Sequence, residues 1–350
     1  MLNAVIMAGG RGERFWPRSR FHKPKQLQAI AGSETMLQMT VKRMQPLIPL
    51  EQIYIVTDQK LEREVKRQLP GLPERNVIAE PVGRNTAAAV GLSAVQIGRL
   101  DEDATLAVLP ADHLIFDEKE FLACLSIGAK VAREKNRLVV FGIKPDRPET
   151  GYGYIKAGGE ISEKVYEVET FVEKPDEKTA KKFLASGRYY WNSGMFVWKY
   201  SVIMAAIEKH MPRLFAGLQK IRTAPKKEVI TEVYEKIENI SIDYGVMEKA
   251  QNRVMVMGDF RWDDIGSWLA MERIWQKDGE GNVSQGKFVG IDTHNSIIVG
   301  DKTLVATIGI SNMIVVTTDD AILICPKEKA QEVKKMIRKL VDMGETEYIE

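Results

Sequence analysis

The chain has 350 residues, of which 44% are hydrophobic and 28% are charged, as in ordinary globular proteins. This length favours one large domain with a smaller second one over a single core. The 50 Lys and Arg residues nearly balance the 48 Asp and Glu residues. That balance argues against a general nucleic-acid-binding protein, which needs basic charge concentrated on one face.

The two cysteines, Cys124 and Cys325, lie far apart in apolar surroundings, so we expect free, buried thiols and no disulfide or zinc site. The N-terminal residues 1–8 lack a basic region before their apolar run, which predicts a first strand and not a signal peptide. No apolar run approaches the roughly 18 residues that span a bilayer. We therefore expect a cytoplasmic protein without a membrane partner.

Short apolar runs alternate with helical patterns through the first half of the chain. The runs predict buried strands at residues 4–7, 53–56, 76–79, 105–109 and 138–143, and the helical patterns cover residues 59–69, 85–100 and 118–134. This alternation is typical of an α/β fold with a Rossmann-like, mixed and mostly parallel sheet covered by helices.

Residues 151–260 are less regular, with strands expected at 152–155, 166–172, 195–198 and 253–257 and helices that include 177–185 and 228–237. After about Gly281 the pattern changes to short β-type runs joined by Gly, Asn and Asp turns, followed by a basic helix over 327–340. We therefore predict a first domain over residues 1–281 and a small β-rich C-terminal domain over 282–350.

A glycine-rich loop follows the first predicted strand, with the sequence Ala8-Gly9-Gly10-Arg11-Gly12-Glu13-Arg14-Phe15-Trp16-Pro17. Glycines let a backbone approach phosphate and present N–H groups to it. Six cations lie in or near the loop, namely Arg11, Arg14, Arg18, Arg20, Lys23 and Lys25. The loop matches neither the dinucleotide fingerprint nor a Walker loop. A polyphosphate site fits this pattern, and a mobile surface loop with solvated charges is the alternative.

The glycines, Arg14 and Pro17, together with Pro24-Lys25, resemble the signature loop of the sugar-1-phosphate nucleotidylyltransferases. The resemblance implies that Ala8, Gly9, Gly10 and Gly12 surround the nucleotide triphosphate. It also implies that Arg14 and Lys25 are catalytic, holding the charge of the transferring phosphoryl group. Lys23 has no role that the motif assigns.

The stretch Glu80-Pro81-Val82-Gly83-Arg84-Asn85-Thr86-Ala87 follows the third predicted strand. Asn85 or Thr86 suits the cap of the next helix. The stretch also resembles a motif of the mannose-1-phosphate guanylyltransferases, which implies that Glu80, Pro81, Asn85 and Thr86 bind the nucleotide. A carboxylate and an amide match the N1–H and N2–H donors and the O6 acceptor of guanine.

Two aspartates occupy positions that suit a metal ion. Asp112, within Pro110-Ala111-Asp112-His113, follows the fourth predicted strand, and Asp264 lies within Trp262-Asp263-Asp264-Ile265-Gly266-Ser267. Either aspartate suits a helix N-terminus equally well. Both segments resemble family motifs, which implies that Asp112 and Asp264 bind Mg²⁺ and that Ala111 contacts the nucleotide. Asp263 has no assigned role.

Three further segments resemble sugar-binding elements of the family. They are Thr150-Gly151-Tyr152-Gly153-Tyr154, Phe171-Val172-Glu173-Lys174-Pro175 and Trp191-Asn192-Ser193-Gly194. Each alone is also consistent with a structural role, as a turn, an ion pair or a buried strand. The resemblance implies that Gly153, Glu173, Lys174 and Asn192 bind the sugar phosphate, with carboxylate, ammonium and amide groups facing hydroxyl and phosphate oxygens.

We therefore expect an enzyme that transfers GMP from GTP to mannose 1-phosphate by in-line attack with Mg²⁺, releasing pyrophosphate. The β-rich C-terminal residues predict a homodimer, because that domain is too small for a generous core. The alternatives are the same chemistry with another base or sugar, and a non-catalytic subunit that senses GDP-mannose. A dehydrogenase is less consistent with the sequence, because the dinucleotide fingerprint is incomplete.

Overall fold

The computed structural model describes residues 1–350 and separates into two compact units, each assembled from several stretches of chain. The first unit comprises residues 1–9, 40–111 and 115–262. The second unit comprises residues 10–39, 112–114 and 263–350. The glycine-rich loop thus passes from the first unit to the second between Gly9 and Gly10.

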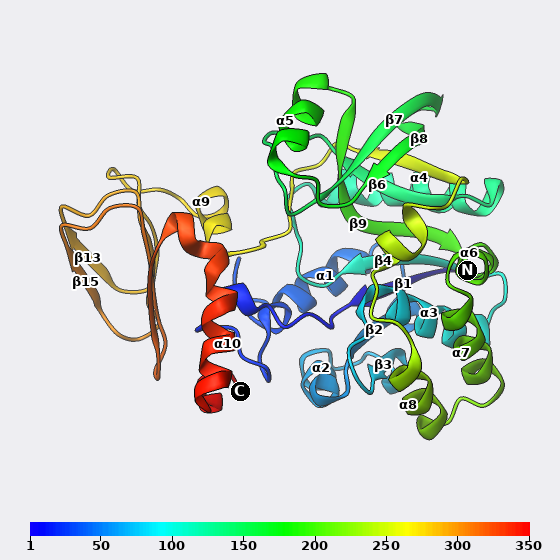
Figure 1. Cartoon of the computed structure of the whole chain (residues 1–350), viewed down its shortest axis with the longest axis horizontal. Coiled ribbons are helices and arrows are strands. Elements are labelled where there is room, and N and C mark those ends of the chain that lie inside the picture. The colour runs from blue at the N-terminus through cyan, green and yellow to red at the C-terminus, as the bar shows by residue number, and fades with distance from the viewer. The chain divides into compact units, whose positions relative to one another are not determined.

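The first unit is built on a nine-stranded mixed sheet (Figure 1). Its strand order is β3-β2-β1-β4-β9-β6-β10-β8-β7. The strands are β1 Leu2–Met7, β2 Ile53–Asp58, β3 Val77–Glu80, β4 Thr105–Pro110, β6 Leu138–Ile143, β7 Gly153–Ser162, β8 Val165–Val172, β9 Tyr189–Lys199 and β10 Arg253–Gly258. Strands β1 to β4 are mutually parallel, whereas β9 pairs antiparallel with both β4 and β6. The predicted α/β fold with a mixed sheet is confirmed.

Helices cover the sheet of the first unit. The longer ones are α2 Glu62–Gln68, α3 Asn85–Gly98, α4 Glu118–Lys135, α5 Glu177–Ser186, α6 Tyr200–His210, α7 Pro212–Thr223 and α8 Lys227–Lys236. Helix α3 is buried almost throughout because its Ala-rich sequence lets neighbours approach closely. A Cβ on Gly91 would lie 2.6 Å from the Leu218 side chain of α7, so glycine leaves room for that side chain. The chain passes from one unit to the other within three short elements, α1 Met36–Met44, β5 Leu114–Ile115 and β11 Trp262–Asp263.

The second unit contains two small sheets of strands that stack in successive turns (Figure 1). Strands β12 Val283–Gln285, β14 Ile297–Val299, β16 Met313–Thr317 and β17 Ile322–Pro326 form one sheet, and β13 Phe288–Ile291 and β15 Val305–Ile308 form the other. The pairing is parallel between β12 and β14, between β14 and β16, and between β13 and β15, and no helices connect these strands. This is the geometry of a β-solenoid. Helices α9 Met271–Ile274 and α10 Val333–Met343 complete this unit.

One apolar core joins the glycine-rich loop to the solenoid within the second unit. Phe15 and Trp268 pack with ring centroids 4.9 Å apart, and both belong to a buried cluster that also contains Val283 and Ile314. Burial of these large side chains stabilises the segment after the loop, by roughly 1.5–3 kcal/mol for each aromatic or aliphatic group. The loop therefore rests on a packed base.

Most predicted strands and helices are confirmed to within a few residues. Helices α1, α6 and α7 had no sequence prediction, and the basic C-terminal helix begins as a tighter turn over Lys327–Glu332 before α10. Cys124 is buried as predicted, but Cys325 is only partly buried because its strand β17 has an exposed face. No helix is long and apolar enough to cross a membrane.

Candidate active site

The glycine-rich loop of the second unit closes tightly over Lys25. Gly12 has φ +60°, and a Cβ at this position would lie 2.6 Å from the Lys25 Cβ. Only glycine fits both the left-handed backbone and this close approach. The Gln26 side-chain amide donates to the Gly10 carbonyl at 2.7 Å and fixes the opposite arm of the loop.

The Lys25 ammonium is buried and shared between two acceptors. The residue is 3% exposed, and its Nζ donates to the Asp112 carboxylate at 2.8 Å and to the Asp264 backbone carbonyl at 2.6 Å. A buried ammonium persists only when its charge is paired and its protons are bonded. Lys25 thus joins three stretches of chain, the loop segment and the two predicted metal motifs, at one point.

A cavity of about 400 Å³ opens beside this ammonium. It brings together the predicted residues Gly12, Arg14, Lys25, Asp112 and Asp264. Its other lining residues are Arg11, Glu13, Phe15, His113, Ile265, Gly266 and Lys334. The exposed Arg14 guanidinium donates only to the Gln331 side chain in this structure. The cavity therefore combines cations suited to phosphate oxygens with carboxylates suited to a metal ion.

The charges around Asp112 favour its ionised form. Burial alone would raise the pKa of Asp112, but the nearby Lys25 ammonium outweighs it and holds that pKa below its usual value. Burial lowers the pKa of His113, so this imidazole is neutral at pH 7. Asp112 is consequently an anion beside a cation, the state required of a metal ligand.

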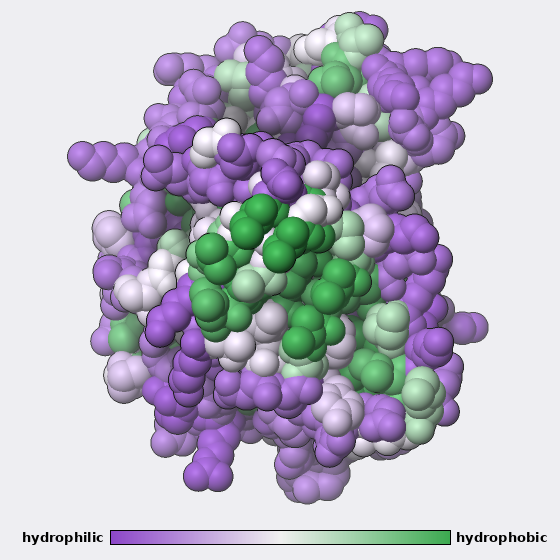
Figure 2. Space-filling model, turned by 90° about the vertical axis from the view of Figure 1, so that its left-hand side faces the viewer, coloured by the Kyte–Doolittle hydropathy of each residue, from purple (hydrophilic) through white to green (hydrophobic).

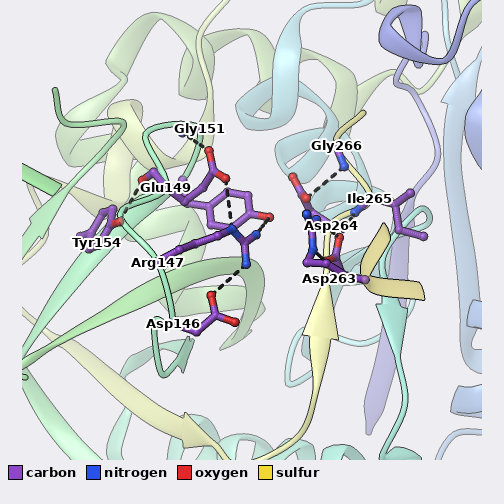
Figure 3. A network of polar contacts seen from close by, with 11 residues as sticks. Asp146, Arg147, Glu149, Gly151, Tyr154, Asp263, Asp264, Ile265 and Gly266 are labelled. Carbon is purple, nitrogen blue, oxygen red and sulfur yellow. Dashed lines mark hydrogen bonds and ion pairs between the residues drawn. The ribbon is translucent and has the colours of Figure 1, made fainter. Parts of the chain in front are cut away.

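Asp263 and Asp264, although adjacent, have different surroundings (Figure 3). Asp263 is 6% exposed, accepts two bonds from the Arg273 guanidinium at 2.5 and 2.9 Å, and accepts from the Ile265 N–H. Asp264 is partly exposed on the cavity and accepts from the Gly266 N–H at 3.1 Å. Asp263 thus anchors the turn that presents Asp264, a role the sequence left open.

Only part of the predicted cation cluster lies at the cavity. Arg11, Arg14 and Lys25 line the cavity, whereas Arg18 donates to Gln285 and Arg20 pairs with Asp320 at 2.7 Å. Arg18 and Arg20 therefore attach the loop segment to the solenoid, and Lys23 is exposed in a turn. Lys334 lines the cavity from the basic C-terminal helix. The sequence did not indicate this role, because Lys334 lies far along the chain from the other lining residues.

Glu80 lies in the first unit with Ala8 and Gly9. It is 5% exposed, and a Cβ on Gly9 would lie 3.5 Å from its Oε2. Burial raises the pKa of Glu80 to about 7. A contact with the Tyr234 hydroxyl lowers this pKa, and the nearby Asp58 raises it further. Its Oε1 has no hydrogen-bond partner. A buried carboxylate with an open acceptor suits a ligand that supplies donors.

The residues that follow Glu80 do not form the helix cap predicted at Asn85 or Thr86. Asn85 has φ +66°, its side chain accepts from the Thr86 N–H, and helix α3 begins without a cap at the preceding residue. The Thr86 hydroxyl instead accepts from the Ile242 N–H at 2.8 Å, so neither side chain caps α3 in the expected way. Pro81 and Ala111 lie in the same unit, at the ends of β3 and β4, where ligands of open α/β sheets bind.

The four predicted sugar-phosphate residues come together in the first unit. Glu173 pairs with Lys174 at 3.0 Å, and its Oε2 is buried without a partner. A Cβ on Gly153 would lie 2.3 Å from that Oε2 and 3.1 Å from the Asn192 Cβ, so glycine leaves room for both side chains. Asn192 donates to Asp243, a residue that no sequence motif indicated.

Arg147, in the segment before β7, forms a second network in the first unit (Figure 3). It pairs with Asp146 at 2.9 Å and with Glu149 at 3.5 Å, and its guanidinium lies 4.8 Å from the Trp191 ring centroid. Glu149 also accepts from the Gly151 N–H, and its carbonyl accepts from the Tyr154 hydroxyl. These bonds hold the glycine-containing segment that leads to Gly153.

Comparison with known proteins gives a consistent result. The family model "Nucleotidyl transferase" matches residues 3–281, and the model "MannoseP isomerase/GMP-like beta-helix domain" matches residues 286–340. A mannose-1-phosphate guanylyltransferase of Escherichia coli is 40% identical, over 99% of this chain and 76% of that protein. The xanthan biosynthesis protein XanB of Xanthomonas campestris pv. campestris is 39% identical, over 98% of this chain and 74% of that protein.

A solved structure agrees with both. The crystal structure titled mannose-1-phosphate geranyltransferase, from Thermus thermophilus, has 36% sequence identity and a TM-score of 0.89, covering 97% of this chain and 99% of that one. The chain is therefore an enzyme of the nucleotidyl transferase family and belongs to its mannose-1-phosphate guanylyltransferases.

Proposed function

We propose that this enzyme transfers GMP from GTP to α-D-mannose 1-phosphate and so makes GDP-mannose and pyrophosphate. The main support is the cavity of the second unit, where Arg14, Lys25, Asp112 and Asp264 meet. The names of its relatives support the choice of substrates. Measuring pyrophosphate release with GTP, ATP, UTP and dTTP against mannose, glucose and fucose 1-phosphates tests the proposal.

The chemistry follows from charge and position. A phosphate oxygen of the sugar substrate attacks the α-phosphorus of GTP, and the bond from that phosphorus to the bridging oxygen of pyrophosphate breaks in line. Arg14 and Lys25 hold the negative charge that spreads over the phosphoryl oxygens. No covalent intermediate is required, because the sugar phosphate oxygen is itself the nucleophile.

The donors at the cavity fit Mg²⁺. Asp112 and Asp264 both line the cavity and carry hard carboxylate oxygens. The structure has no group of three or more His, Cys, Asp or Glu side chains that could hold a metal ion. Mg²⁺ is commonly held by one or two carboxylates, with water and substrate phosphates completing its shell. When bound, the ion would offset charge on the α-phosphate and on the departing pyrophosphate. Asp263 would act indirectly, through the turn that it anchors.

Substrate recognition is assigned to the first unit. Glu80 would bind the guanine base, together with Pro81, Asn85 and Thr86. Other contacts to the nucleotide would come from Ala8, Gly9 and Ala111, and from Gly10 and Gly12 farther along the glycine-rich loop. Gly153, Glu173, Lys174 and Asn192 would bind the sugar phosphate. The open acceptors on Glu80 and Glu173 support this assignment, since each carboxylate is buried and has one oxygen without a donor.

We also propose a cytoplasmic homodimer with a nucleotidyltransferase domain over residues 1–281 and a C-terminal domain over 282–350. Figure 2 shows apolar side chains gathered in one patch on the side that carries the C-terminal strands. The exposed large apolar residues in or beside strands β13, β15 and β17 are Val289, Ile291, Leu304, Ile308, Ile322 and Ile324, each at least 51% exposed. Apolar patches of this kind mark association surfaces, and a second copy is the partner proposed.

Two alternatives remain distinguishable. The same chemistry with another base or sugar would show a different preferred pair in the substrate panel. A non-catalytic subunit that senses GDP-mannose would bind this product without releasing pyrophosphate from any pair. The shared placement of Arg14, Lys25, Asp112 and Asp264 favours catalysis over sensing.

Lys25→Ala should lower kcat by about 10²- to 10³-fold, roughly 3 kcal/mol, because one cation facing the transition state is lost. Steady-state kinetics with a circular dichroism check of folding measures this. Lys23→Ala is the matched control, since Lys23 is exposed two residues away. Wild-type turnover in a folded Lys25→Ala enzyme would rule out the role.

Asp112→Asn and Asp264→Asn should each reduce kcat severely, and the double variant should be little worse than either, because both are assigned to one ion. Each should also raise the Mg²⁺ concentration for half-maximal rate. Titrating Mg²⁺ for all four enzymes measures both effects. Additive losses with an unchanged Mg²⁺ requirement would exclude the shared ion.

Glu80→Gln should weaken GTP more than ATP, because guanine supplies two edge donors that a carboxylate accepts. Since the pKa of Glu80 is about 7, GTP affinity of the wild type should rise as pH increases through 7, while the Gln variant lacks this rise. Calorimetric binding across pH 6–8 is the measurement. Equal losses for both nucleotides would exclude base reading by Glu80.

Ile291→Glu combined with Ile308→Glu should convert the dimer to a monomer, because two charges would be buried in an apolar interface. Light scattering measures the mass. Ile161→Glu, at a similarly exposed residue in the first unit, is the control. An unchanged dimer mass would contradict the assignment. Point variants are preferable to removal of residues 282–350, which would strip the core under Phe15.

A further inference from the structure

Asp243 begins an unusual turn in the first unit, a five-residue π-helix over Asp243–Met247. Such turns are rare and occur frequently at functional sites. A Cβ on its Gly245 would lie 2.4 Å from the Met211 sulfur, so glycine leaves room for that side chain. The backbone is tied by bonds from the Gly245 N–H to Ser241 and from the Glu248 N–H to Asp243. Asp243 is therefore presented by a rigid piece of backbone.

The orientation of the Asn192 side chain follows from its two partners. Its amide nitrogen lies 2.8 Å from the Asp243 carboxylate, which only accepts when ionised, and its oxygen lies 3.0 Å from the Gly194 N–H, which only donates. The opposite orientation would place acceptor against acceptor and donor against donor. Asp243 thus determines which end of the Asn192 amide lies toward the carboxylates and leaves the second N–H for another acceptor.

Glu173 supplies the complementary group. Its side chain is 7% exposed, one oxygen pairs with Lys174, its backbone N–H donates to Glu248, and its Oε2 has no partner. An amide donor on one side and an unpartnered carboxylate oxygen on the other match two adjacent hydroxyls, one accepting and one donating. Gly153 keeps the space beside Oε2 free of a side chain.

We propose that Asp243 is a positioning residue for the sugar phosphate: its carboxylate holds the Asn192 amide so that Asn192 and Glu173 together bind adjacent sugar hydroxyls. This proposal rests on the proposed function. The charged groups facing Asp243 are Glu173 and Lys174, which follow β8, and the polar Asn192 lies on β9. Burial, followed by repulsion from Glu173, raises the pKa of Asp243 to about 6.

The first test is Asp243→Ala, which removes the acceptor. We expect the KM for mannose 1-phosphate to rise about tenfold or more, while kcat and the KM for GTP stay within about threefold. Asp243→Asn should restore the KM, since an amide carbonyl still accepts from Asn192. Asp176→Asn, which alters only the exposed cap of α5, should change neither KM. Equal rises in both KM values would indicate a merely structural role and overturn the proposal.

A double-mutant cycle tests whether Asp243 acts through Asn192. In the Asn192→Ala background, Asp243→Ala should add little to the KM for mannose 1-phosphate. Fully additive effects would contradict the proposal.

Failure of the proposed function is distinguishable from failure at Asp243. Wild-type enzyme inactive with every substrate pair would contradict the proposed function. The Asp243 variants are then compared by calorimetric binding of mannose 1-phosphate, where loss in Asp243→Ala with recovery in Asp243→Asn supports the positioning role. Equal binding by wild type and Asp243→Ala overturns it.

Discussion

The arrangement of the candidate active site depends on the buried Lys25 ammonium. Its contacts with the Asp112 carboxylate and the Asp264 carbonyl join segments that are 87 and 239 residues away along the chain. Because Lys25 is buried, removal of its carboxylate partner would leave an unpaired buried charge, which is destabilising. The same ammonium lies at the cavity, so one group organises the acidic segments and supplies positive charge.

The loop around Lys25 is specified as much by packing as by glycine. Gly12 allows the backbone to touch Lys25, and Phe15, three residues later, packs against Trp268 in the core of the second unit. Two neighbouring arginines, Arg18 and Arg20, bind solenoid residues. Of the cations near the glycine-rich loop, some therefore line the cavity and others attach the loop segment to the solenoid. The position of each side chain relative to the core decides which of the two it does.

The sequence predicted features that depend on local pattern. Buried strands such as Leu138–Ile143 are visible as continuous apolar runs, and the segment with Asp112 follows the end of strand β4. Features that depend on distant contacts were not visible. The bidentate Asp263–Arg273 pair, Lys334 at the cavity and Asp243 beside Asn192 each join residues that no local pattern relates. The expected cap of α3 was wrong because Thr86 bonds Ile242, 156 residues away.

Buried carboxylates with open acceptors explain how such a site becomes selective. Glu80 and Glu173 each bury an oxygen that lacks a donor. An unsatisfied buried polar group costs roughly 1–3 kcal/mol, so the free protein is less stable than its contacts alone suggest. A substrate that supplies the missing donor removes this cost on binding, whereas an analogue without the donor leaves it in place. Sites that bind a hydroxyl or N–H in this way reject such analogues far more strongly than apolar pockets do. With the proposed roles of Glu80 and Glu173, the stability lost by burying these acceptors would be the physical source of discrimination between bases and between sugars.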